Sequence, residues 1–238
     1  MPYGCPGKTF YYSKEVNEIK KLIDKVEKID GITGAIEFGN YTKKLNKNDL
    51  EYIKLNEQLV DEIIHLASVS HQHTISKVYC TYFRDDGYNI KEKLDEFLES
   101  LNFYSMCDNS INYSLIKYAE KMLNFFEMGN KDIIKYSTYL ADAYFDVGEE
   151  RKANDIITDL INKHPNYDEP YQVMINWYMY KKEDIKKLEN IVRKAKSNKH
   201  WLVSGSFVYE KILQHYKGNE EKYSKYEKLY KEWEEQVG

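Results

Sequence analysis

The chain has 238 residues, of which 42% are hydrophobic and 31% charged, and its formal net charge is −4. This composition excludes an intrinsically disordered chain, and the slightly acidic charge gives no overall attraction to nucleic acid or anionic lipid. No apolar run approaches the roughly 20 residues that a membrane-spanning helix needs, and the N-terminal segment lacks the apolar core of a secretory signal. The three cysteines, Cys5, Cys80 and Cys107, are too few for a disulfide framework. We therefore expect a cytoplasmic protein.

Residue usage is uneven in a way that reflects the genome. Only three of the 35 basic residues are arginines, at positions 84, 151 and 193, and 23 residues are tyrosine. Abundant lysine, isoleucine, asparagine and tyrosine are typical of an AT-rich genome, and we infer a bacterium or its phage. Tyrosine is also a large amphipathic contact residue, so the bias can serve packing or binding.

The N-terminal part is predicted to be mainly helical. Apolar residues recur at helical spacing from Ser13 to Asp30, and three glycines then indicate a loop or short hairpin over residues 32–41. A second helix is expected to begin near Asn48, a favoured N-cap residue. Residues 68–83 fit either a strand or a continued helix. The Asp-Asp-Gly sequence at 85–87 indicates a turn.

We place a domain boundary at that turn, between residues 1–88 and residues 89–238. The second part is predicted to be a regular series of helices. Apolar stripes mark helices near 94–101 and 116–126, and Gly129-Asn130 is expected to close the second of them. Helix pairs follow over about 131–164, 169–197 and 200–236.

The first of these pairs carries a recognisable pattern. Counting back from Pro165, Leu140 and Tyr144 lie on the first helix, Gly148 lies at the turn, and Ala153 is a small residue where the second helix approaches. This pattern resembles one tetratricopeptide repeat, a helix-turn-helix unit of about 34 residues. The resemblance weakens over the next pair and is only rhythmic elsewhere. It implies an all-α array of helical hairpins in a right-handed superhelix, with a divergent, mainly helical N-terminal part.

In the family that the pattern resembles, the first helix of each repeat lines a concave groove. The residues at the corresponding positions here are Lys135, Thr138, Asp142, Phe145, Gln172, Asn176, Met179 and Tyr180. Asn176 matches an asparagine that binds a peptide backbone or carboxylate in related domains, whereas the acidic Asp142 would repel a carboxylate. The resemblance therefore implies a non-catalytic scaffold, adaptor or inhibitor without a cofactor. It would bind another protein or a peptide with basic and apolar residues.

Two alternatives remain open from the sequence. Lysines between 181 and 199 could contact nucleic acid without reading its sequence. The first 88 residues could instead form an enzyme or metal-binding module, because His65, His71, His73 and Cys80 are clustered. The spacing of these histidines and the cysteine matches no established zinc pattern. For the lysines between 181 and 199, a solvated helix face is the simpler interpretation. The Gly-Lys-Thr sequence at 7–9 lacks the earlier glycine of a phosphate-binding loop.

Overall fold

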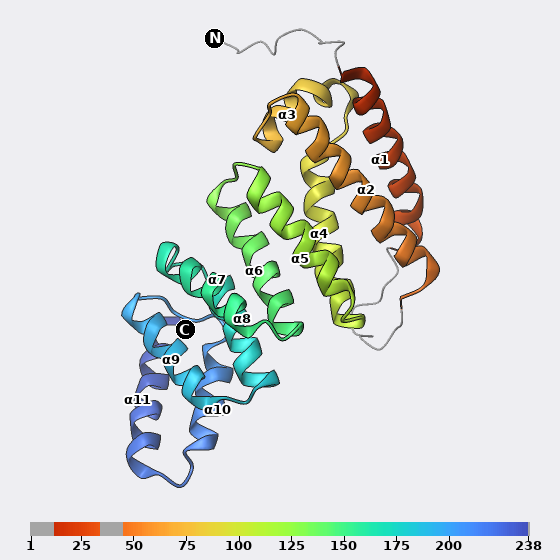
Figure 1. The fold of residues 1–238 in the computed structure, drawn as a ribbon. Helices are drawn as coiled ribbons and strands as arrows, with labels where there is room; N and C mark the ends of the chain where they lie inside the picture. Colours follow the sequence, from red (N-terminus) through yellow and green to blue (C-terminus); the bar gives the residue numbers. More distant parts are fainter. Residues whose placement is uncertain (1–11, 34–44, 238) are drawn as a thin grey trace, which may run out of the picture. The chain divides into compact units, whose positions relative to one another are not determined.

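The computed structural model describes residues 12–33 and 45–237 (Figure 1). Within those ranges every regular element is a helix, which confirms the all-α class. The chain separates into two compact units, Met1–Val147 and Gly148–Gly238, which we call unit 1 and unit 2 and describe separately. The predicted boundary after residue 88 does not coincide with this division and stays a prediction.

Unit 1 is built from helices that pack on their neighbours in the chain (Figure 1). The pairs α1–α2, α4–α5 and α5–α6 make the main contacts, and α3 packs on α4. The elements are α1 (Ser13–Thr33), α2 (Lys47–Val69), α3 (Ile75–Tyr82), the short 3-10 helix η2 (Arg84–Asp86), α4 (Ile90–Cys107), α5 (Ile111–Phe125) and α6 (Asn130–Asp146).

Unit 2 follows the same rule, since α7 packs on α8, α8 on α9, α9 on α10, and α10 on α11 (Figure 1). One element is unusual, because α8 continues directly into a π-helix. The elements are α7 (Glu150–Lys163), α8 (Glu169–Asn176), the π-helix η3 (Trp177–Lys181), α9 (Ile185–Ser197), α10 (Gly205–His215) and α11 (Glu220–Val237).

Three expected helix boundaries differ in the structure, one of them because of a side-chain cap. The N-cap of α2 is Asn46 rather than Asn48, and its side chain and that of Asp49 form a capping box. Helix α1 continues to Thr33, so residues 32 and 33 are helical rather than part of the expected loop; residues 34–44 lie outside the described part. Gly129 has φ −72° and precedes α6, so it does not close α5 in a left-handed conformation as expected.

The segment that fitted either a strand or a continued helix holds the end of α2, a turn and the separate helix α3. Helix α2 ends at Val69, and His71 adopts a left-handed conformation with φ 55°. Thr74 then caps α3 by accepting a hydrogen bond from the Lys77 N–H. The expected turn at 85–87 is present, with Gly87 at φ 78°. Gly148 has φ 85° and lies at the predicted turn before α7.

Buried tyrosines recur between helices that are separate in the sequence. Each ring fills apolar space, and its hydroxyl reaches a carboxylate on another helix, so the polar end is not left without a partner. The buried rings and their acidic partners are Tyr118–Asp61, Tyr136–Asp95 and Tyr144–Glu120 in unit 1, and Tyr178–Glu150 and Tyr226–Glu189 in unit 2. Burial and the adjacent carboxylates raise the pKa of the phenols of Tyr118, Tyr136 and Tyr226.

We predict that the free energy of unfolding falls as pH rises above 10. Tyr209 is buried against Tyr230 and Trp233, and burial raises its pKa from the ordinary 10.0 to about 12, with Glu232 adding to the shift. The unfolded chain releases this proton near pH 10, whereas the folded chain keeps it longer. The stabilisation is therefore complete below pH 10 and is lost as pH approaches 12. Urea unfolding at a series of pH values measures this decline.

Tyr209→Phe is the control, because phenylalanine cannot titrate. Its stability should fall less steeply with alkaline pH than that of the wild type. Identical slopes in the two proteins would contradict the role of Tyr209.

We also predict that Gly205→Ala destabilises unit 2 by about 1–3 kcal/mol through overpacking. The indole of Trp233 fills the space that a Cβ at Gly205 would need, and its Nε1 donates to the Leu202 carbonyl at 3.0 Å. Urea unfolding followed by tryptophan fluorescence measures the loss. Gly218→Ala is the matched control, because a Cβ there would meet nothing within 4 Å. An equal loss in both variants would show that the effect is not a clash with Trp233.

Candidate functional site

The predicted groove residues fall into two sets, one on α6 of unit 1 and one on α8 and η3 of unit 2. On α6, Thr138 and Phe145 are buried, and the Thr138 hydroxyl donates to the Lys135 carbonyl at 2.7 Å. The Lys135 ammonium lies 2.5 Å from the Glu99 carboxylate of α4. Lys135 and Asp142 are therefore the partly accessible members of this set.

The second set forms a stripe along α8 and η3. Gln172 and Asn176 are one helical turn apart, and the Gln172 amide donates to the Asn176 side-chain oxygen at 2.8 Å. Tyr180 follows on η3 with 65% of its surface exposed, and Asn176 is also exposed. Met179, the remaining member, is buried. Three predicted residues, Gln172, Asn176 and Tyr180, thus present polar and aromatic groups along one accessible stripe.

Two contacts place α10 beside this stripe. The Ser204 hydroxyl, just before α10, donates to Gln172 Oε1 at 2.7 Å. The Lys211 ammonium of α10 lies 3.4 Å from the Glu183 carboxylate, just after η3. The two contacts follow the same order along both segments, from Ser204 to Lys211 and from Gln172 to Glu183. Helix α10 therefore runs parallel to α8 and η3.

An exposed phenylalanine lies on the same side of α10. Phe207 comes one turn after Ser204 and one turn before Lys211, and 62% of its surface is exposed. Sequence reasoning assigned it only to a helix. The buried stripe of α10 runs through Val208, Tyr209 and Ile212, and the position of Phe207 outside that stripe was the available signal. We call the surface made of Gln172, Asn176, Tyr180, Ser204, Phe207 and Lys211 the α8–α10 surface.

The segment between α9 and α10 is fixed to the start of α8. Asp168 Oδ1 accepts a hydrogen bond from the Val203 N–H at 3.0 Å and lies 3.3 Å from His200 Nε2. The His200 ring stacks on Tyr171 with 4.7 Å between ring centroids. The Asn198 amide donates to the Tyr171 hydroxyl at 2.7 Å. These contacts set where α10 begins, so the α8–α10 surface is held by buried or partly buried polar groups rather than by the exposed residues themselves.

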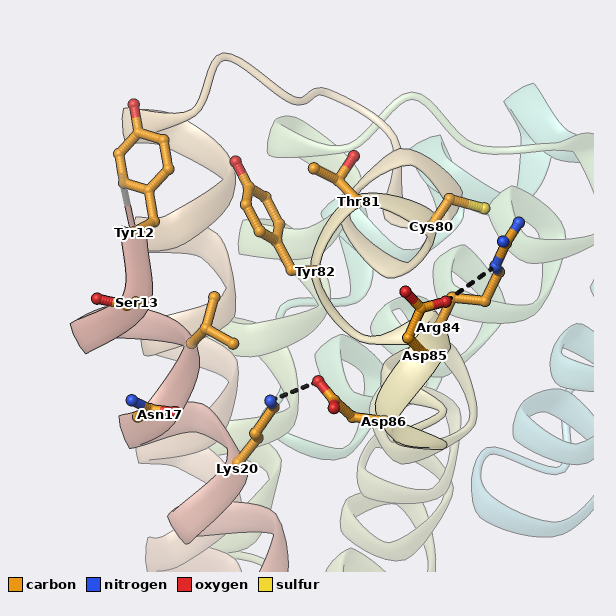
Figure 2. A pocket seen from close by; sticks show the side chains of 11 residues that line it. Tyr12, Ser13, Asn17, Lys20, Cys80, Thr81, Tyr82, Arg84, Asp85 and Asp86 are labelled. Carbon is orange, nitrogen blue, oxygen red and sulfur yellow. Dashed lines mark hydrogen bonds and ion pairs between the residues drawn. The ribbon is translucent and has the colours of Figure 1, made fainter. Parts of the chain in front are cut away.

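Unit 1 contains a small pocket of about 220 Å³ between α1 and the α3–η2 segment (Figure 2). Figure 2 shows Lys20 and Asp86 pointing toward one another across it, and their charged groups are 2.5 Å apart. Arg84 is paired with Asp85 at 3.7 Å. The exposed Cys80 thiol is on the wall, but none of the described residues that line the pocket is a histidine. The pocket therefore offers the thiol no imidazole base, and its charges are largely compensated.

The clustered histidines and Cys80, which suggested the alternative metal-binding reading, do not form such a group in the described residues. Within residues 12–33 and 45–237, no three His, Cys, Asp or Glu side chains are placed to share a metal ion. His73 instead packs against the Phe125 ring, 6.0 Å between centroids. The Gly-Lys-Thr sequence at 7–9 and Cys5 lie outside the described residues.

The lysines between 181 and 199 are spread over η3, α9 and the turn after α9, and several have local partners. Lys182 lies 3.5 Å from Glu150 and over the Trp177 ring. Lys196 lies 2.6 Å from Glu232, and Lys194 donates to the Asn162 side chain. Pairing with carboxylates reduces the charge that this stretch can offer to a phosphate backbone.

Searches of protein-family models, curated proteins and solved structures found nothing that matches this chain. Among the described helices, none combines the length and apolar character that crossing a bilayer requires.

Proposed function

We propose that the protein is a non-catalytic scaffold that binds a peptide segment of another protein on the α8–α10 surface. One observation carries the proposal: two parallel helical segments, tied by Ser204–Gln172 and Lys211–Glu183, expose Tyr180 and Phe207 together with the Asn176 amide. The tetratricopeptide-like pattern from Tyr136 to Pro165 supports it, because first helices that run side by side form the binding face in that family.

The chemistry of the surface suits an extended peptide. Asparagine and glutamine side chains each donate and accept hydrogen bonds, which lets them pair with a peptide backbone whatever its side chains. Tyr180 and Phe207 offer large rings that lose little side-chain entropy on binding, and exposed aromatic residues are enriched among binding hot spots. The hydrogen bonds of Gln172 to both Asn176 and Ser204 hold these groups in place before a partner arrives.

The test is selection of binding peptides from a displayed random library on the purified full-length chain. We predict that the selected peptides carry apolar or aromatic residues and bind the double variant Tyr180→Ser/Phe207→Ser at least about tenfold more weakly, since losing each hot-spot ring costs at least about 1 kcal/mol. Fluorescence anisotropy with individual selected peptides measures the affinities. Both side chains are mostly exposed, so the variant should keep the thermal stability of the wild type.

Tyr113→Ser is the matched control, because this tyrosine of α5 in unit 1 is 66% exposed and lies outside the proposed surface. It should leave affinity unchanged. The proposal fails if the selected peptides bind the double variant as tightly as the wild type, or if selection enriches no sequence at all.

A further inference from the structure

A second accessible groove lies in unit 2, on the two helices that take no part in the α8–α10 surface. It runs between α9 and α11 and encloses about 510 Å³. Val192, Tyr226 and Leu229 form its apolar base, of which Val192 and Tyr226 are buried. Basic side chains from both helices border it, namely Arg193 and Lys196 on α9 and Lys222 and Lys225 on α11.

The local charge of this groove is opposite to that of the whole chain. Its one lining carboxylate, Glu189, accepts a hydrogen bond from the Tyr226 hydroxyl. Lys196 is neutralised by Glu232 at 2.6 Å. Lys222 donates to the Tyr216 hydroxyl at 2.9 Å and lies over that ring, so it is positioned but keeps its charge.

Besides Lys222, two cations of the groove are available to a ligand. Arg193 hydrogen-bonds the neutral side-chain oxygen of Asn190, and the Lys225 ammonium lies 5.4 Å from the Tyr226 ring centroid. Within the described part of the chain, neither has a carboxylate within 4.0 Å. Arginine binds carboxylates in a two-pronged geometry, and clusters of basic residues recognise acidic motifs in peptides.

We propose that the α9–α11 groove binds an acidic segment of a protein partner, in which carboxylates contact Arg193 and Lys225 and an apolar side chain rests on Val192 and Leu229. The base of the groove favours this occupant over nucleic acid. Bases bind by stacking on exposed aromatic faces, whereas Tyr226, the aromatic residue of the base, is only 5% exposed. The aliphatic side chains beside it offer contacts to leucine-like groups instead.

This inference goes beyond the proposed function, because it concerns other helices and a partner of different chemistry. Binding at each of the two surfaces can therefore be disproved independently of the other. Tyr180→Ser/Phe207→Ser should leave binding at the α9–α11 groove unchanged, and variants of the groove should leave the library-selected peptides unaffected.

The test uses a fluorescein-labelled peptide of sequence Asp-Glu-Leu-Leu-Glu-Asp, titrated with the full chain at low salt and followed by anisotropy. We expect saturable binding that weakens as salt is added. Arg193→Glu/Lys225→Glu should weaken binding at least about tenfold, because it places like charges against the peptide. The amide analogue Asn-Gln-Leu-Leu-Gln-Asn and the serine analogue Asp-Glu-Ser-Ser-Glu-Asp should both bind more weakly than the acidic leucine peptide.

Lys54→Glu/Lys77→Glu is the matched control, since both lysines are exposed in unit 1 and the net charge changes by the same amount. This control should retain the affinity of the wild type. Equal weakening in the two double variants would overturn the proposal, because overall charge would then explain the binding. Failure of the acidic peptide to bind, equal binding of the amide analogue, or tighter binding of a labelled oligothymidylate would overturn it as well.

Discussion

Helix packing in this protein depends on burying tyrosines whose hydroxyls still need a polar partner. A buried ring gains from leaving water, but a phenol without a hydrogen bond would lose about 1–3 kcal/mol of that gain. The chain meets both conditions by placing a carboxylate on a second helix, as Asp95 does for Tyr136 and Glu150 for Tyr178. Each such pair joins two helices through one buried side chain. The large tyrosine content thus has a structural role within each unit.

Because each helix buries one stripe of side chains, residues beside that stripe stay exposed to solvent. In unit 2, α10 buries Val208, Tyr209 and Ile212, so Phe207 points away from that stripe. In η3, Tyr178 and Met179 are buried and Tyr180 is exposed. Single exposed apolar residues are ordinary on protein surfaces. Here two aromatic residues lie on neighbouring helical segments that polar contacts hold in register, which is why we interpret this surface as functional.

Sequence reasoning predicted the helices well, because apolar residues at helical spacing are a local signal. It could not decide residues 68–83, where the apolar run is short; a side-chain cap from Thr74 begins the separate helix α3 within them. It transferred groove positions by counting from one repeat, which placed Gln172, Asn176 and Tyr180 on an accessible stripe. The same counting could not foresee that Thr138 and Phe145 are buried, because burial depends on residues distant in the sequence. The hydrogen bond from the Ser204 hydroxyl to the Gln172 side-chain oxygen is likewise a long-range feature that periodicity does not contain.

The central claim is that a partner peptide binds where α8, η3 and α10 run side by side. The most direct measurement is NMR mapping of backbone amide shifts in isotope-labelled protein as a library-selected peptide is added. We predict that the largest shifts fall within residues 172–183 and 203–211, around the ties between Ser204 and Gln172 and between Lys211 and Glu183. Shifts confined to the pocket between α1 and the α3–η2 segment, with the α8–α10 surface unchanged, would contradict the account.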